Sequence, residues 1–187
     1  MSVLAPGLLV AAPPLGDPNF DQSVVLLAAH GEDGAFGWVV NGPEVMSIAE
    51  LLVRADITKD KLAVGGVVRV GGPVSPEQVW LVYPARHRFP NIDGQFEVGP
   101  SVVASASRQV LEEIAASQTP EGLFGIVGYA GWAPSQLENE IRAGAWLPTD
   151  IVPSLVFNEP REAIWQKAYE QIGATPMSFT AKTVGSA

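Results

Sequence analysis

The sequence predicts an α+β fold built on a largely antiparallel sheet. Two observations favour it: apolar, β-branched runs of strand length recur along the chain, and glycine-containing turns join several of them. A third observation is that helical segments do not alternate regularly with these runs, as the crossover connections of a parallel sheet would require. The 187 residues, 47% of them hydrophobic, fit one domain with a substantial core.

The expected elements begin with a strand and a hairpin. Residues 8–12 form a short apolar run that Pro13 ends. Residues 24–29 and 36–40 are apolar and β-branched, so we expect them to be two paired strands. The stretch between them contains a turn over residues 31–34, in which Gly34 can adopt a positive φ, and this predicts a hairpin.

The middle of the chain is expected to contain two helices separated by short strands. Ser47 and Glu50 have the spacing of a capping box at the start of a helix over residues 47–55. A tight turn at Gly71 and Gly72 separates two of the expected strands. The further elements expected here are strands over residues 67–70, 79–83, 96–98 and 102–104, and a helix over residues 108–116.

The next part of the chain is expected to hold a strand, a helix and a final strand. An apolar strand over residues 123–129 leads into the stretch "GYAGW". After it, Ser135 and Glu138 have capping-box spacing for a helix that Gly144 can end. Residues 154–157 are a short apolar run, which we interpret as the last strand.

The last helix is expected to begin near Pro160, a natural first-turn residue, and to stop at Gly173. Its inward face would carry Ile164, Trp165, Ala168, Tyr169 and Ile172. We expect a single domain over residues 1–187, with an ordered core over about residues 7–175 and a mobile polar tail after Pro176.

Composition and charge disfavour several classes of function. The formal net charge is −9, with 11 Lys and Arg against 20 Asp and Glu, which opposes binding to a polyanion. The chain has no cysteine, and neither of its two histidines lies in an HxH or HExxH pattern, so we expect no metal and no other cofactor. The N-terminus lacks the basic region of a signal peptide, and no apolar stretch could span a bilayer. We therefore expect a cytoplasmic protein that does not bind membranes.

The stretch "HGEDGAFGWVVNGP" and the loop before it contain four candidate site residues. His30 could act as a general base if a nucleophile lay nearby, or it could be a structural histidine. Asn41 could bind a ligand, or it could end its strand by bonding the local backbone. Asp17 and Phe20 could form a ligand rim, or they could belong to a rigid turn with Phe20 in the core.

The stretch "GYAGW" and the helix after it supply the other two candidates. Trp132 could line a pocket at the end of its strand, while Gln136 holds a polar group of a ligand. A buried Trp132 that anchors the junction would explain the same residues. No serine lies in a G-x-S-x-G pattern, and the glycine pairs at 65–66 and 71–72 lack the spacing of a phosphate-binding loop. The sequence therefore contains no assembled catalytic or nucleotide-binding motif.

Four longer stretches carry a family resemblance. They are "GLLVAAPPLGDPNFDQSVV", "HGEDGAFGWVVNGP", "VGGPV" and "GYAGWAPSQLENEIRAGAWL". In this order and spacing they resemble the AlgH/YqgE family of uncharacterised bacterial proteins. The resemblance implies a coiled, largely antiparallel sheet with a partly barrel-like centre and several flanking helices. Many members carry the label of transcriptional regulator.

One position departs from the family pattern. Ser135 stands where members often have glycine before the residue that corresponds to Gln136. If that glycine lets a ligand approach the backbone, the departure puts such a site in doubt. If the position only starts a helix, serine is the better N-cap.

Two interpretations of function stay open. The first is a non-enzymatic binding or regulatory protein that acts through a small ligand or a protein partner. The alternative is an enzyme with a site around His30, Asn41 and Trp132. Direct binding to nucleic acid is not expected, because the chain is acidic and shows no helix-turn-helix spacing.

Overall fold

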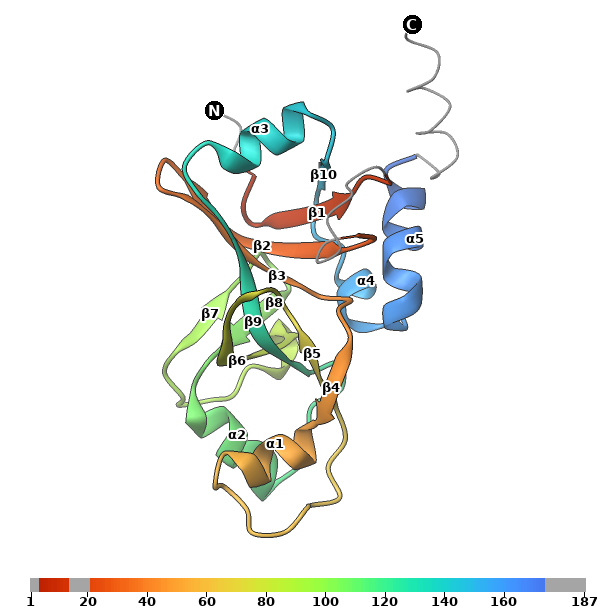
Figure 1. Ribbon diagram of the computed structural model, residues 1–187. Helices are drawn as coiled ribbons and strands as arrows, with labels where there is room; N and C mark the ends of the chain where they lie inside the picture. Colours follow the sequence, from red (N-terminus) through yellow and green to blue (C-terminus); the bar gives the residue numbers. More distant parts are fainter. Residues whose placement is uncertain (1–3, 14–20, 174–187) are drawn as a thin grey trace, which may run out of the picture.

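The fold is built around one curled, largely antiparallel sheet that forms a half-barrel, with helices around it (Figure 1). The computed structural model describes residues 4–13 and 21–173, so the expected mobile tail lies outside the described residues. The strands are β1 (Gly7–Ala11), β2 (Val24–Gly31), β3 (Gly34–Val39), β4 (Glu44–Ser47), β5 (Val67–Val70), β6 (Val74–Pro84), β7 (Gln95–Glu97), β8 (Val102–Ser105), β9 (Phe124–Trp132) and β10 (Trp146–Thr149). The helices are α1 (Ile48–Arg54), α2 (Arg108–Ala116), α3 (Gln136–Arg142), α4 (Pro153–Phe157) and α5 (Arg161–Gln171), with a short 3-10 helix at Ala85–His87.

Strand β9 joins the two halves of the sheet. The strand order is β10-β1-β2-β3-β9-β6-β8-β7, and every neighbouring pair on this path is antiparallel. The first half of β9 pairs with β6 and, in parallel, with β5, whereas its last residues pair with β3. Between these halves, Gly128 has a φ of 75°, and a Cβ there would lie 2.3 Å from the carbonyl oxygen of Gly72. Only glycine allows the two segments to approach this closely.

The buried side chains form three clusters, one on each side of the upper half of the sheet and one in the lower half. One side of β1, β2 and β3 packs against α4 and α5, through residues such as Leu155 and Tyr169. The other side packs against α3 and β10, with Leu137 and Trp146 at the centre. In the lower half, α1 and α2 cover β5, β6 and β8. This arrangement leaves α5 alongside the turns that follow β3 and β5.

The predicted fold class and several predicted elements are confirmed. The first hairpin forms, with Gly34 at a φ of 122° and Gly31 paired with Gly34. Ser47 and Glu50 form a complete capping box at the start of α1. Helix α2 has the predicted bounds, and the predicted inward residues of α5 are buried or half-buried against the core.

Some sequence-based expectations were wrong. The apolar run at residues 154–157 belongs to helix α4, not to a strand. Pro153 occupies the first helical position, which suits its fixed φ, and a run this short does not distinguish a strand from a buried helical turn. The stretch "GYAGW" is not a strand-to-helix junction, because β9 continues through it to Trp132. Strands β4 and β10 were not predicted.

Candidate functional site

The structure places four of the six candidate residues and separates them into two groups. His30, Trp132 and Gln136 lie where α3 meets the sheet, whereas Asn41 follows the far end of β3. Asp17 and Phe20 lie outside the described residues.

His30 and Trp132 lie on the same face of the sheet. Both pair directly with Ala35 of β3, one from β2 and the other from β9, and directly paired residues share a face. The ring Nε2 of His30 lies 2.7 Å from Oε1 of Glu138 on α3. The backbone N–H of Glu138 and, second, the His30 ring hydrogen-bond this carboxyl and lower its pKa below the ordinary value of 4.5. His30 therefore holds the start of α3 to the hairpin.

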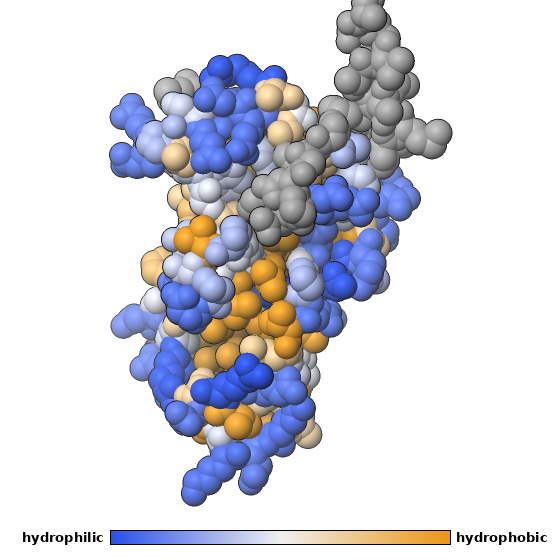
Figure 2. Space-filling view, viewed as in Figure 1, coloured by the Kyte–Doolittle hydropathy of each residue, from blue (hydrophilic) through white to orange (hydrophobic). Residues whose placement is uncertain are grey.

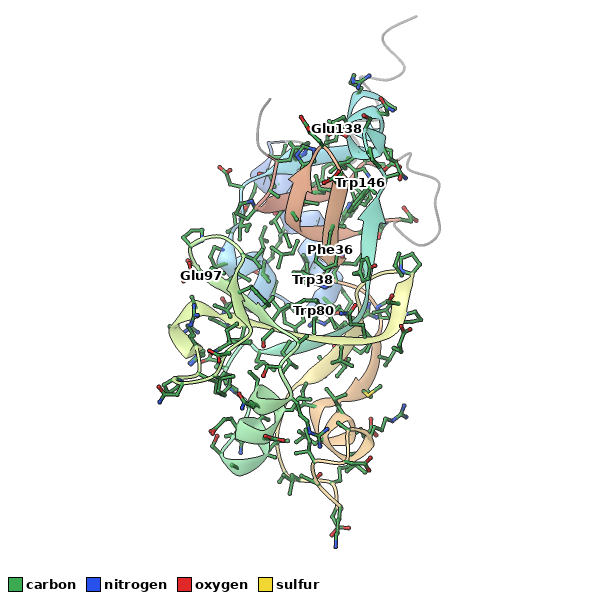
Figure 3. All side chains as sticks on the ribbon, turned by 90° about the vertical axis from the view of Figure 1, so that its left-hand side faces the viewer. Phe36, Trp38, Trp80, Glu97, Glu138 and Trp146 are labelled. Carbon is green, nitrogen blue, oxygen red and sulfur yellow. The ribbon has the colours of Figure 1, made fainter. Side chains whose placement is uncertain are left out.

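Trp132 and Gln136 meet at one carboxylate, that of Glu140. Its Oε2 accepts hydrogen bonds from the indole N–H groups of Trp132 and Trp146, each at 2.9 Å. Its Oε1 accepts one from the Gln136 amide at 2.9 Å, and Gln136 in turn accepts the backbone N–H of Ala133. The two tryptophans are 6% and 1% exposed. These contacts attach α3 to β9 and β10, and Figure 3 shows Glu138 and Trp146 together at that end of the molecule.

Ser135 does not cap α3 as its sequence position predicted. Its φ of 64° and ψ of −3° are left-handed, and its side chain makes no capping hydrogen bond. A left-handed residue strongly favours glycine, which explains the glycine that the resembling family often has at this position. The capping-box expectation was wrong because the spacing of Ser135 and Glu138 does not specify the backbone conformation. The predicted end of the helix is correct, with Gly144 at a φ of 80°.

Asn41 lies away from the α3 group. Ala35 and Val39 are four residues apart on β3, which corresponds to roughly 14 Å at about 3.4 Å per residue, and Asn41 comes still later. The structure therefore does not bring Asn41 together with His30 and Trp132. The side chain of Asn41 accepts the backbone N–H of Val24 and donates to the carbonyl of Gln22, both at 2.9 Å.

Asn41 opens onto a cleft, which we call the α5 cleft. It has a volume of about 450 Å³ and lies between the start of α5 and the turns after β3 and β5. Figure 1 shows the connection from β3 to β4 passing close to the start of α5, where the helix follows α4. Figure 2 shows hydrophobic residues gathered in the middle of this side of the molecule, with hydrophilic residues along its margins. The residues that line the cleft are Asp21, Gln22, Ser23, Val39, Asn41, Gly42, Pro43, Val70, Gly72, Pro73, Arg161, Glu162 and Trp165.

Two arginine side chains in or beside the cleft are less exposed than their acidic partners. Arg161 is 34% exposed and contacts Glu162, whose side chain is 70% exposed, at 3.3 Å. Arg69, beneath the cleft wall, is only 12% exposed and donates to the carbonyl of Val40 at 2.8 Å. Burial lowers the pKa of Arg69, and the positive charge of Arg161 lowers it further. The two guanidinium groups are therefore close enough to act on one another.

The α5 side of this cleft was not predicted from the sequence. Arg161 and Trp165 were assigned to an ordinary amphipathic helix, and nothing near them in the sequence marks a binding site. The one available signal among the described residues was Asn41. Phe20 directly precedes Asp21, which lines the cleft.

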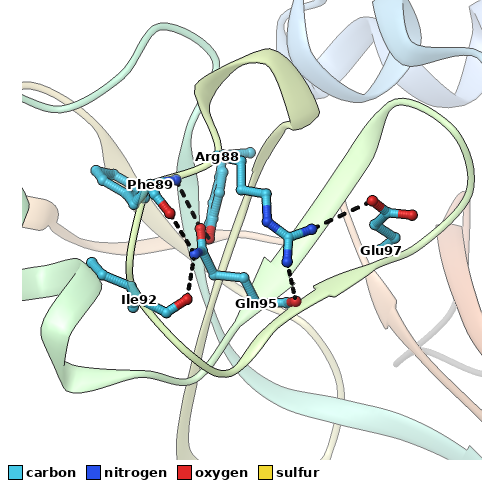
Figure 4. Close-up of polar contacts among 6 residues, drawn as sticks. Arg88, Phe89, Ile92, Gln95 and Glu97 are labelled. Carbon is cyan, nitrogen blue, oxygen red and sulfur yellow. Dashed lines mark hydrogen bonds and ion pairs between the residues drawn. The ribbon is translucent and has the colours of Figure 1, made fainter.

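A second polar cluster surrounds Gln95 and is fully engaged in the structure. The side-chain oxygen of Gln95 accepts from Tyr83 and from the backbone of Phe89, and its amide donates to the carbonyls of Phe89 and Ile92 (Figure 4). Arg88 adds longer contacts, of 3.4 Å each, to the Gln95 carbonyl and to Glu97. Burial raises the pKa of Tyr83 to about 12. This cluster holds the loop between β6 and β7 in place.

An aromatic group occupies the middle of the half-barrel. Phe36, Trp38 and Trp80 lie one below another in Figure 3, with ring centroids 4.9 Å and 5.1 Å apart for neighbouring pairs. Tyr129 packs on Phe36 at 4.8 Å. The indole nitrogens of Trp38 and Trp80 are enclosed and have no hydrogen-bond partner in the part of the chain that the structure describes. The packing and burial of the rings offset the cost of leaving these indole N–H groups without an acceptor, so we interpret the aromatic group as part of the hydrophobic core.

Neither a metal-binding cluster nor a membrane-spanning helix is found in the described ranges, 4–13 and 21–173. No three His, Cys, Asp or Glu residues there gather in a way that could hold a metal ion. Among the same residues, none of the helices combines the length and the apolar character needed to cross a bilayer.

Comparison with known proteins shows similarity along nearly the whole chain. A family model described as AlgH-like matches residues 8–177. A UPF0301 protein of Anaeromyxobacter sp. is 41% identical over 184 residues, which cover 95% of this chain and 92% of the relative. A UPF0301 protein of Paracoccus denitrificans is 34% identical, with 92% of each chain covered.

Two solved structures are similar to this one. The solution structure of the AlgH protein from Pseudomonas aeruginosa has a TM-score of 0.77 and 32% identity, and the match covers 96% of this chain and 94% of that one. A crystal structure of a Corynebacterium diphtheriae protein has a TM-score of 0.70 and 26% identity, with 89% and 86% covered.

Proposed function

We propose that this chain, which belongs to the AlgH-like family, is a non-enzymatic binding protein whose small-molecule ligand occupies the α5 cleft. The cleft itself carries the proposal. Its volume of about 450 Å³ falls within the roughly 300–1,000 Å³ that is usual for small-molecule sites. It also combines an apolar wall, including Val70 and Trp165, with polar groups from Ser23 and Arg161. Such a combination binds a ligand and fixes its orientation.

The walls of the cleft are held by backbone contacts before any ligand binds. The backbone N–H of Val70 donates to the carbonyl oxygen of Pro43 at 2.9 Å. The backbone N–H of Val39 donates to the carbonyl oxygen of Gly71 at 2.8 Å. The Asn41 side chain fixes the chain on both sides of Ser23. A preformed site loses less conformational entropy when its ligand binds, which favours affinity.

The position of the cleft beside α5 provides a way for ligand binding to regulate a protein partner. Helix α5 is attached to β1 by the hydrogen bond from the Trp165 indole to the carbonyl of Ala11, at 2.8 Å, and by apolar contacts. A ligand in the cleft would contact both α5 and the turns of the sheet, and would strengthen this attachment. A regulatory role would then follow from the ligand-dependent position of α5, without direct contact with DNA.

A thermal-shift screen against metabolites tests the proposal. A ligand at a hundred times its Kd adds about 2.7 kcal/mol to the free energy of unfolding. For a chain of this size, that raises Tm by roughly 5–11 °C. Pro73 lines the cleft and its side chain is exposed, so Pro73→Trp should obstruct the cleft without filling the core.

Pro76→Trp is the matched control, because Pro76 is also exposed, lies three residues later in β6 and does not line the cleft. The proposal predicts a ligand-dependent shift that Pro76→Trp keeps and Pro73→Trp loses. A shift that both variants keep would place the ligand elsewhere. A screen without any shift would contradict the small-molecule proposal and favour a protein partner.

A further inference from the structure

We infer that the α5 cleft binds an oxyanion of its ligand, a carboxylate or phosphate group, through Arg161, the first backbone N–H groups of α5 and the hydroxyl of Ser23. This inference rests on the proposed function, because it specifies the chemistry of the ligand in the same cleft.

The first observation is an unpartnered hydroxyl on a largely buried residue. Ser23 lines the cleft and is only 6% exposed. No hydrogen bond from its hydroxyl to any other described residue is present, although the backbone on both sides of it is fixed by Asn41. The Ser23 hydroxyl therefore opens onto the cleft with no acceptor among the described residues, and a ligand oxygen in the cleft would provide one.

The second observation is the start of α5. This helix of 11 residues begins at the cleft, and its N-cap is Pro160, which offers no side-chain oxygen to its first N–H groups. These N–H groups and the helix dipole favour negative charge at this position. Glu162, in the first turn, provides part of that charge, but its side chain is 70% exposed and extends towards solvent.

The third observation is the charge around the cleft. Arg161 contacts Glu162 through Nε, and in the described part of the chain its two terminal nitrogens make no hydrogen bond. Arg69 lies behind the wall, with its nearest carboxylate, Glu44, at 4.0 Å and 46% exposed. Both arginine side chains are thus less exposed than their acidic partners. Asp21 is the other acid that lines the cleft, and it is also exposed.

An oxyanion matches these three features. A guanidinium with free terminal nitrogens can donate two parallel hydrogen bonds to a carboxylate or a phosphate. The hydroxyl of Ser23 and the N–H groups of α5 would supply further donors from two other directions. The apolar side of the cleft, at Val39 and Trp165, would then contact the rest of the ligand.

Titration of the full, ¹⁵N-labelled chain with sodium phosphate and with sodium citrate, at constant ionic strength, tests this inference. We expect saturable changes in the amide signals of Ser23, Arg161 and Glu162 with at least one of the two anions. The anion that saturates at the lower concentration distinguishes phosphate from carboxylate as the preferred group. Arg161→Gln should raise Kd by about tenfold or more, and Ser23→Ala should raise it roughly three- to tenfold.

Arg86→Gln is the matched control, because Arg86 is exposed and makes no ion pair or hydrogen bond with another described residue; its Kd should stay unchanged. Changes of equal size in Arg161→Gln and the unaltered chain, or changes that sodium chloride reproduces, would overturn the inference. If neither anion saturates while a neutral or cationic compound gives a thermal shift that Pro73→Trp abolishes, this inference fails and the proposed function holds. If no compound binds, both fail.

Discussion

Trp132 and Trp146 donate their indole N–H groups to the same oxygen, Oε2 of Glu140, each at 2.9 Å. Their rings meet edge to face, with centroids 5.9 Å apart and an interplanar angle of 81°. One residue lies on β9 and the other on β10, while Glu140 lies on α3 between them in the sequence. A single carboxylate therefore joins three elements at one end of the sheet.

This relationship predicts that Glu140→Ala is strongly destabilising. The substitution removes the acceptor of two enclosed indole groups and of Gln136, and hydrogen bonds to a charged group contribute about 1.5–3 kcal/mol each. Allowing for partial relaxation, we expect a loss of about 2–3 kcal/mol, or a fall in Tm of roughly 4–12 °C, in urea and thermal unfolding. Glu140→Gln should lose less, because it keeps one acceptor oxygen. Equal losses in Glu140→Ala and in Glu113→Ala, at an exposed position on α2, would contradict this interpretation.

Ser135→Gly is expected to stabilise the protein. Ser135 is left-handed, a conformation that costs a non-glycine residue roughly 1–2 kcal/mol, and its side chain makes no capping bond that would be lost. Glycine also raises the conformational entropy of the unfolded chain, which offsets part of this gain. The net increase in the free energy of unfolding should be about 0.5–1 kcal/mol. Urea unfolding of Ser135→Gly and Ser135→Ala provides the test. Alanine has the same backbone cost as serine, so a similar gain with alanine would show that backbone strain is not the cause.

The contact between Glu138 and His30 predicts a dependence of stability on pH. The hydrogen bonds to the Glu138 carboxyl lower its pKa in the folded state, first through its own backbone N–H and then through His30. Its stabilising contribution should therefore be complete above the ordinary pKa of 4.5 and should be lost as the pH falls through the lower, folded-state pKa. Glu138→Gln lacks this contribution at every pH.

This prediction is tested by urea unfolding of the unaltered chain and of Glu138→Gln from pH 7 to pH 3. The difference in unfolding free energy between the unaltered chain and Glu138→Gln should be constant down to about pH 5 and should narrow below that. Glu113→Gln, at an exposed position, serves as the control for the loss of one carboxylate. A difference that persists unchanged to pH 3 would rule out the proposed linkage.

Local sequence patterns predicted the elements whose determinants lie within a few residues of one another. The capping box at Ser47 and Glu50, the hairpin that turns before Gly34, and the end of α3 at Gly144 follow from hydrogen bonds and backbone angles within a single turn. The α+β class followed from the same kind of information, because hairpins and periodic helices each have a local signature. The family resemblance was also contained in the order of four local motifs.

The tertiary structure decided the rest. Whether residues 154–157 form a strand or a helix depends on the core that Leu155 and Val156 contact, not on their own composition. The α5 cleft is lined by Asn41 and by the start of α5, which are remote in the sequence. The sequence alone determined the local elements, because their hydrogen bonds are local. Only the folded chain determined the candidate site, because its walls meet through long-range packing.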